Sequence, residues 1–200
     1  MNSKTPRLSH IRSQYENSAR DRINENRHYQ RPIHRFGRLI SLSLSSNDSN
    51  RLLLGYGISK IMHGLYLGGH DVATNLDLLN QHHITHIINL TKNIENKFRT
   101  KIEYLTIKVE DAESENLGKH FKPTFNYIDQ LLTSNSSFNI LVHCNAGVSR
   151  SASIVIAYLM QKGLFRTYKE AFEFVKSKRS IVSPNKGFVK QLIQLESTLN

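Results

Sequence analysis

Residues 140–160 read ILVHCNAGVSRSASIVIAYLM, and this stretch predicts the architecture of the domain around it. Asn139–His143 is a short apolar run of the kind that forms a buried parallel strand. Ser151–Met160 is apolar almost all round, which predicts a buried helix. The segment therefore reads as a strand, a tight turn and a helix.

The turn between strand and helix has the composition of an anion-binding loop. Its successive backbone N–H groups, together with the N-terminus of the helix, would converge on one point. Gly147 allows tight curvature, and Arg150 can add a bidentate fork to phosphate oxygens. The same positive field favours the thiolate of Cys144, which is the nucleophilic form. The residues predicted to bind phosphate are Asn145, Ala146, Gly147, Val148, Ser149 and Arg150.

Residues His143 to Ser151 resemble the H-C-x-x-G-x-x-R-S/T signature of cysteine-based phosphatases. The continuation SASIVIAYLM resembles the dual-specificity branch of that superfamily. The resemblance extends from about Tyr56 through Leu195 and includes GLYLGG, ITHIINLT, the VED segment and SPNKGF. It does not cover the first fifty residues.

The resemblance implies a role for several residues. Cys144 would attack phosphorus, Arg150 would bind its oxygens, and Asp111 in VEDAESEN would protonate the leaving group. Glu110 and Glu113 are neighbouring acids, but only Asp111 falls at the family position. The supporting residues that the resemblance implies are Ser151 for the thiolate, His143 for the order of the loop, Asn185 as a brace for the loop and Arg179 near the pocket rim.

Hydrophobic patterns outside this segment predict one α/β domain with a mostly parallel, twisted sheet flanked by helices. Strands are expected at 58–62, 65–67, 85–90 and 104–109. Helices are expected at 72–79, at 117–132 with Pro123 in the first turn, after the Thr167–Glu170 capping box, and after Ser183-Pro184. We place the domain boundary near Asn50, with a catalytic domain at 51–200 and a disordered basic arm at 1–50.

Composition limits the classes of protein to be considered. The chain has 200 residues, of which 38 % are hydrophobic, so it can supply one sizeable core. It has a single cysteine and can form no internal disulfide, which suits the cytoplasm, or also the nucleus. No apolar run approaches the roughly 18 residues of a membrane span, and the start lacks the apolar region of a secretory signal.

The net charge of +11 favours acidic partners. Phosphorylated proteins are the expected substrates. Nucleic-acid binding is not expected, because no folded nucleic-acid module is recognisable. In the arm, Arg35, Arg38, Leu39, Leu42 and Leu44 resemble peptides that dock on acidic grooves of mitogen-activated kinases, although a solvated basic tail explains the same pattern.

Neither a metal nor another cofactor is expected. His82, His83 and His86 form the one histidine cluster of the sequence, and no matching cysteine or carboxylate set accompanies them. Cysteine phosphatases need no metal.

Neighbouring families of phosphatases differ from this sequence at defined positions. A lipid phosphatase of the tensin type would have lysines where this chain has Ala146 and Val148, and an RNA 5′-phosphatase usually has N-R-T-G at the end of the loop. Receptor-like tyrosine phosphatases carry a W-P-D loop, and this chain has no tryptophan. The pattern that remains is that of the small, atypical dual-specificity enzymes. A phosphate-binding scaffold is the non-enzymatic alternative.

Overall fold

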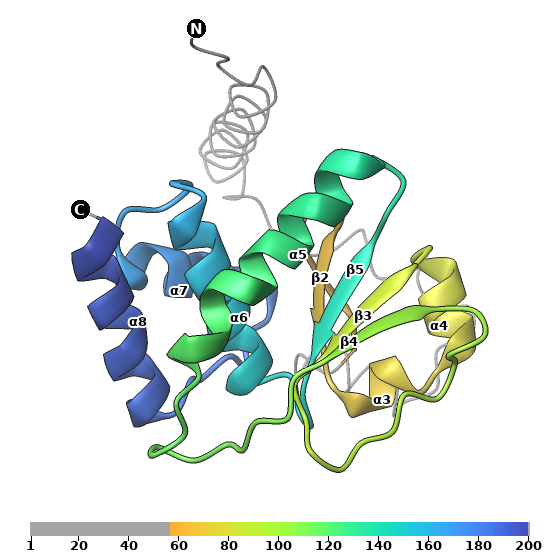
Figure 1. Ribbon diagram of the computed structural model, residues 1–200, viewed down its shortest axis with the longest axis horizontal. Helices are drawn as coiled ribbons and strands as arrows, with labels where there is room; N and C mark the ends of the chain where they lie inside the picture. Colours follow the sequence, from red (N-terminus) through yellow and green to blue (C-terminus); the bar gives the residue numbers. More distant parts are fainter. Residues whose placement is uncertain (1–56, 200) are drawn as a thin grey trace, which may run out of the picture. The chain divides into compact units, whose positions relative to one another are not determined.

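A computed structural model describes residues 57–199, which contain a five-stranded sheet in the order β1-β2-β5-β3-β4 (Figure 1). Neighbouring strands run parallel, except that the edge strand β1 is antiparallel to β2. The sheet is therefore mostly parallel, as predicted. The strands are β1 (Ser59–Met62), β2 (Leu65–Gly68), β3 (His86–Asn89), β4 (Glu103–Thr106) and β5 (Ile140–His143).

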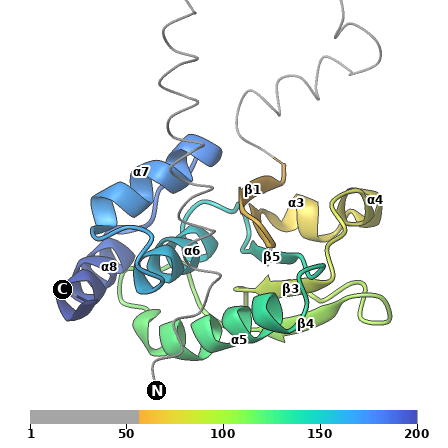
Figure 2. The ribbon, with the colours of Figure 1, turned by 90° about the horizontal axis from the view of Figure 1, so that it is seen from above.

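Helices cover both faces of this sheet (Figures 1 and 2). The short helices α3 and α4 lie on one face, and α5 and α6 lie on the other, with α7 and α8 packed against α6. The helices are α3 (His70–Ala73), α4 (Leu76–Gln81), the 3₁₀ helix η1 (Gly118–His120), α5 (Phe121–Ser134), α6 (Arg150–Gln161), α7 (Tyr168–Lys178) and α8 (Lys186–Leu199).

The central strand β5 shows why both faces are apolar. Ile140 and Val142 pack into the core beneath α5 and α6, and Leu141 packs into the core beneath α3 and α4. Successive side chains of a strand point to opposite faces, so a strand buried on both sides needs a continuous apolar run. The sequence ILVH meets this requirement.

Helix α6 is buried between its two end residues, as its sequence predicted. Every residue from Ser151 to Met160 is buried. The capping box is also confirmed, because Thr167 Oγ1 accepts from the N–H of Glu170 while the Glu170 carboxylate accepts from the N–H of Thr167. Pro123 lies in the first turn of α5.

The single helix expected over 72–79 is wrong. It is two helices, because α3 ends at Ala73 and Asn75 starts a new helix by accepting a hydrogen bond from the N–H of Leu78 at 3.1 Å. Asparagine is a favoured N-cap residue, and its side chain competes with a continuous helix.

The predicted arm at 1–50 and its boundary near Asn50 lie outside the described residues and stay predictions, as do the five docking residues between 35 and 44. Among the helices of the described part, none is both long and apolar enough to cross a membrane.

Candidate active site

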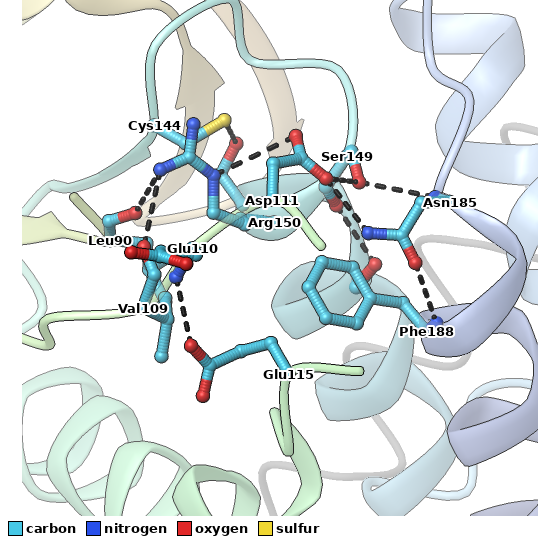
Figure 3. A network of polar contacts seen from close by, with 12 residues as sticks. Leu90, Val109, Glu110, Asp111, Glu115, Cys144, Ser149, Arg150, Asn185 and Phe188 are labelled. Atoms are coloured by element: carbon cyan, nitrogen blue, oxygen red, sulfur yellow. Dashed lines mark hydrogen bonds and ion pairs between the residues drawn. The ribbon is translucent and has the colours of Figure 1, made fainter. Parts of the chain in front are cut away.

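The predicted nucleophile, Cys144, follows β5 directly and is only 1 % exposed. β5 lies between β2 and β3, so residues 144–150 form a loop at the carboxyl ends of parallel strands. Open α/β sheets bind their ligands at this edge. Figure 3 shows Cys144 beside Arg150 and Asp111, which come from α6 and from the segment after β4.

The carbonyl groups of this loop are held from outside. Each carbonyl oxygen from residue 145 to residue 149 accepts a hydrogen bond from the surrounding scaffold. The donors, in order, are His70 N (2.7 Å), Arg179 Nη2 (2.9 Å), Arg179 Nε (2.9 Å), Ser183 N (3.0 Å) and Ser153 N (2.8 Å).

The N–H groups of the loop are consequently turned inward. A trans peptide plane directs the C=O of one residue and the N–H of the next in opposite directions. Gly147 has φ +68°, the left-handed conformation that curls successive N–H groups around one point. Within residues 57–199, none of the backbone N–H groups from 145 to 150 donates to a protein acceptor. The loop is therefore a cradle of free donors, which suits a phosphate group.

The sulfur of Cys144 has a hydroxyl partner. Ser151 Oγ lies 3.2 Å from Cys144 Sγ and donates to it from the first turn of α6. A donor at this place stabilises negative charge on sulfur. The Ser151 side chain is fully buried, so water does not compete with this contact.

His143 holds the backbone next to the nucleophile. Its Nδ1 donates to the carbonyl oxygen of Cys144 at 3.1 Å. Burial lowers the pKa of His143 to about 4, and the hydrogen bond to Cys144 only partly offsets this effect. His143 is thus neutral near pH 7 and donates a hydrogen bond to the backbone beside the loop.

The guanidinium of Arg150 uses one nitrogen for backbone contacts and leaves another without a hydrogen bond to the described residues. Its Nη1 donates to the carbonyl oxygens of Leu90 (3.2 Å) and Val109 (3.3 Å), as Figure 3 shows. Its buried Nε makes no hydrogen bond to any of the described residues and lies 3.7 Å from Asp111 Oδ2, within reach of an ion pair only. Two carbonyl groups thus fix the guanidinium while a donor remains for a ligand.

Asp111 is held by one of its two carboxylate oxygens. Oδ1 accepts from Ser149 Oγ at 2.7 Å and from Asn185 Nδ2 at 2.8 Å. Oδ2 faces Arg150 and has no hydrogen bond to a described residue (Figure 3). Among the described residues, Oδ2 is thus the carboxylate oxygen of Asp111 that is left without a hydrogen-bond donor beside the cradle.

Asn185 joins three parts of the site. Its side chain donates to Asp111, its backbone N–H donates to Ser149 Oγ at 3.1 Å, and its Oδ1 accepts from Phe188 N in the first turn of α8. We expected Asn185 to brace the phosphate loop. Its contacts reach both that loop and the segment that carries Asp111.

The neighbouring acids point to other partners. Glu110 pairs with Lys92 at 2.7 Å, and Glu113 is exposed. Glu115 was not among the residues predicted from the sequence, and its Oε2 accepts from the N–H of Glu110 at 3.0 Å. That hydrogen bond is the largest cause that lowers the pKa of Glu115. An acid that caps its own loop has no distinctive sequence pattern.

Arg179 is not at a pocket rim. It is 1 % exposed and lies behind the phosphate loop, where it contacts the carbonyl groups already described. The expected location near the rim came from the resemblance alone. Arginine is rarely fully buried, so a buried position was not expected from the residue type.

The histidine cluster is not arranged as a metal site. Within the described residues no group of three His, Cys, Asp or Glu side chains could hold a metal ion. His86 is buried, with Nδ1 2.8 Å from Thr85 Oγ1 and Nε2 3.5 Å from Glu103 Oε2.

Comparison with protein families gives one match that covers most of the chain. Residues 65–198 match the family described as dual specificity phosphatase, catalytic domain. Similar curated proteins include Protein phosphatase Slingshot of Drosophila melanogaster, 43 % identical over 134 residues, and Dual specificity protein phosphatase 5 of Rattus norvegicus, 41 % identical over 143 residues. These alignments cover 67 % and 72 % of this chain, but only 12 % and 36 % of those two proteins.

Comparison with solved structures agrees with the family match. The human tyrosine phosphatase-like serine/threonine/tyrosine-interacting protein matches with a TM-score of 0.65 and 36 % identity, over 70 % of this chain and 96 % of that one. The structure of DUSP15 matches with a TM-score of 0.64 and 36 % identity, over 72 % of this chain and 94 % of that one.

Proposed function

Because the chain belongs to the dual-specificity phosphatase family, we propose that it hydrolyses phosphotyrosine and phosphoserine or phosphothreonine in proteins through a phosphocysteine intermediate. One observation carries the proposal. Cys144 Sγ stands at the start of a loop whose N–H groups are free, with a donor from Ser151 on one side and Asp111 beside the same loop.

In the first step the thiolate of Cys144 attacks phosphorus, so that an S–P bond forms and the P–O bond to the leaving group breaks. Asp111 gives its proton to the departing oxygen, because a serine alkoxide is a poor leaving group. The loop N–H groups and Arg150 bind the three equatorial oxygens, where charge accumulates in the transition state.

In the second step a water molecule attacks the phosphorus of phosphocysteine. The Asp111 carboxylate takes a proton from that water, and the S–P bond breaks to release inorganic phosphate. The electron pair returns to Cys144 Sγ, where the hydroxyl of Ser151 at 3.2 Å stabilises the thiolate. Both steps balance without a metal or another cofactor.

Phosphorylated components of kinase signalling are the substrates and partners that we propose, acting in the cytoplasm or also in the nucleus. The basic character of the chain supports acidic, phosphorylated partners. Kinase docking through the segment that contains Arg35 and Leu39 remains a separate prediction.

Hydrolysis of a chromogenic aryl phosphate tests the proposal directly. Turnover by the full chain, together with release of phosphate from phosphotyrosine and phosphothreonine peptides, would support it. A chain that binds inorganic phosphate without turnover would be a scaffold instead. Release of phosphate only from a phosphoinositide or from an RNA 5′ end would identify one of the alternative enzymes.

A further inference from the structure

The buried side chain of Arg179 donates hydrogen bonds to the middle of the phosphate loop. Arg179 follows α7 and donates three hydrogen bonds to backbone carbonyl groups within residues 57–199. Nε donates to Gly147 O and Nη2 donates to Ala146 O, both at 2.9 Å, while Nη1 donates to Gly57 O at 2.7 Å. One edge of the guanidinium thus holds two consecutive carbonyl groups of the loop, and the other end is anchored beside β1.

These hydrogen bonds determine the direction of two N–H groups of the loop. The peptide planes that carry Ala146 O and Gly147 O also carry the N–H groups of Gly147 and Val148. When both carbonyl groups are drawn toward Arg179, both N–H groups turn toward the cradle. The approach is close, because a Cβ on Gly147 would lie 2.9 Å from Arg179 Nη2 and would collide with Gly68 O.

The carbonyl groups of residues 145, 148 and 149 each have a backbone donor, and only that of Ser149 also accepts from a described side chain, the hydroxyl of Ser153. His70, Ser183 and Ser153 hold them through backbone N–H groups, which any residue except proline supplies. Among the five carbonyl groups from residue 145 to residue 149, the two central ones are those that a side chain alone holds within the described part of the chain. A planar fork fits two acceptors at once, whereas a lysine offers a compact point charge.

We propose that Arg179 is a positioning residue for phosphoryl transfer: it directs the N–H groups of Gly147 and Val148 at the phosphoryl oxygens without touching the substrate. The inference rests on the proposed function, because it assumes that the loop binds the transferred phosphoryl group. Arg179 acts on phosphate affinity, and through it on the rate.

The test compares the full-length wild type with Arg179→Lys and Arg179→Gln. The matched control is Arg99→Lys, since Arg99 is exposed and far from α7 in sequence. The inhibition constant of inorganic phosphate and KM for an aryl phosphate are measured for each chain, and thermal unfolding checks the fold. We expect both constants to rise about 10- to 100-fold in Arg179→Lys, as for the loss of one or two hydrogen bonds to a charged ligand, and to stay unchanged in Arg99→Lys.

A merely structural role would give a different result. Partial unfolding lowers the concentration of active enzyme, so kcat falls while KM and the inhibition constant of phosphate keep their wild-type values. If a variant that is folded, as judged by thermal unfolding, shows a lower kcat with wild-type KM and a wild-type inhibition constant of phosphate, the proposal is overturned. If neither variant folds, ¹⁵N-labelled wild type decides the question: added phosphate should shift the amide signals of Gly147 and Val148, and unmoved signals would overturn the proposal.

The same data separate this inference from the proposed function. Phosphate affinity requires no chemistry, so a wild type that binds phosphate but does not hydrolyse aryl phosphate contradicts only the enzymatic proposal. A wild type that hydrolyses aryl phosphate, with normal phosphate affinity in Arg179→Lys, contradicts only the role of Arg179.

Discussion

The loop that carries the nucleophile and the segment that carries Asp111 are held in place in opposite ways. Residues 144–150 are fixed mainly through their own backbone carbonyl groups, and Cys144 is 1 % exposed. Asp111 lies between β4 and η1, its side chain is 38 % exposed, and side chains such as Ser149 and Asn185 hold it. The difference suits the two tasks that we propose for these regions: a cradle must stay fixed, and a proton donor must exchange protons with solvent and substrate.

Cys144→Ser should have the largest effect. The hydroxyl is not ionised near pH 7, so we expect turnover of aryl phosphate to fall by about 10⁴- to 10⁶-fold. The cradle does not use the sulfur, so calorimetry should find inorganic phosphate bound within a few-fold of wild-type affinity. A loss of phosphate binding would mean that the conformation of the loop depends on Cys144 and not mainly on its own backbone carbonyl groups.

Asp111→Asn tests the exposed segment. Hydrolysis of substrates with poor leaving groups should slow by about 10²- to 10⁴-fold, while activated phenyl phosphates, which depart with less protonation, should lose far less. Steady-state rates are measured for a series of aryl phosphates whose leaving phenols increase in acidity. The slope of log rate against the pKa of the phenol reports how much the reaction depends on protonation of the leaving group. Glu113→Gln is the control. If Asp111→Asn leaves the slope unchanged, another acid supplies the proton, and Glu110 is the next to test.

Arg150→Lys tests the contact between the two regions. Arg150 binds the carbonyl groups of Leu90 and Val109 and faces Asp111. The change to lysine therefore removes a hydrogen-bond donor to the substrate phosphate and also weakens the contacts that hold the segment around Asp111. We expect kcat for aryl phosphate to fall by about 10²- to 10³-fold. Arg166→Lys, on the exposed turn before α7, is the control. Near-normal rates in Arg150→Lys would contradict the role that we give to Arg150.

Lys92→Met should have the smallest effect. The pair of Lys92 with Glu110 is exposed on both sides, and such pairs contribute about 0–1 kcal/mol. Turnover should change by less than about fivefold, and the change should shrink at high salt. Lys101→Met is the control. A loss as large as that of Asp111→Asn would mean that this surface pair fixes the acid segment.

The sequence predicted the backbone-held region better than the other. ILVH and SASIVIAYLM specify a buried strand and a buried helix through apolar runs, and Gly147 marks the turn between them. The fold class and the mostly parallel sheet follow from the same patterns. The break at Asn75 was missed, because one capping residue outweighed a helical apolar pattern.

Long-range side-chain contacts carry little sequence signal. Arg179 lies 32 positions from Gly147, and Asn185 lies 74 positions from Asp111. The carbonyl groups of Leu90 and Val109 hold Arg150 through atoms that every residue has. Such partners become visible only when the chain is folded.

The central claim is that the phosphoryl group is bound covalently to Cys144 during the reaction. The variant Ser151→Ala tests this claim most directly. Without the hydroxyl at 3.2 Å the thiolate is a poorer leaving group, so hydrolysis of phosphocysteine should become slower than its formation. Stopped-flow measurement with an aryl phosphate should show a burst of about one phenol per active site. Mass spectrometry of the acid-quenched protein should find one phosphoryl group on the peptide that contains Cys144. A phosphoryl group on another residue, or turnover with neither burst nor adduct, would contradict the account.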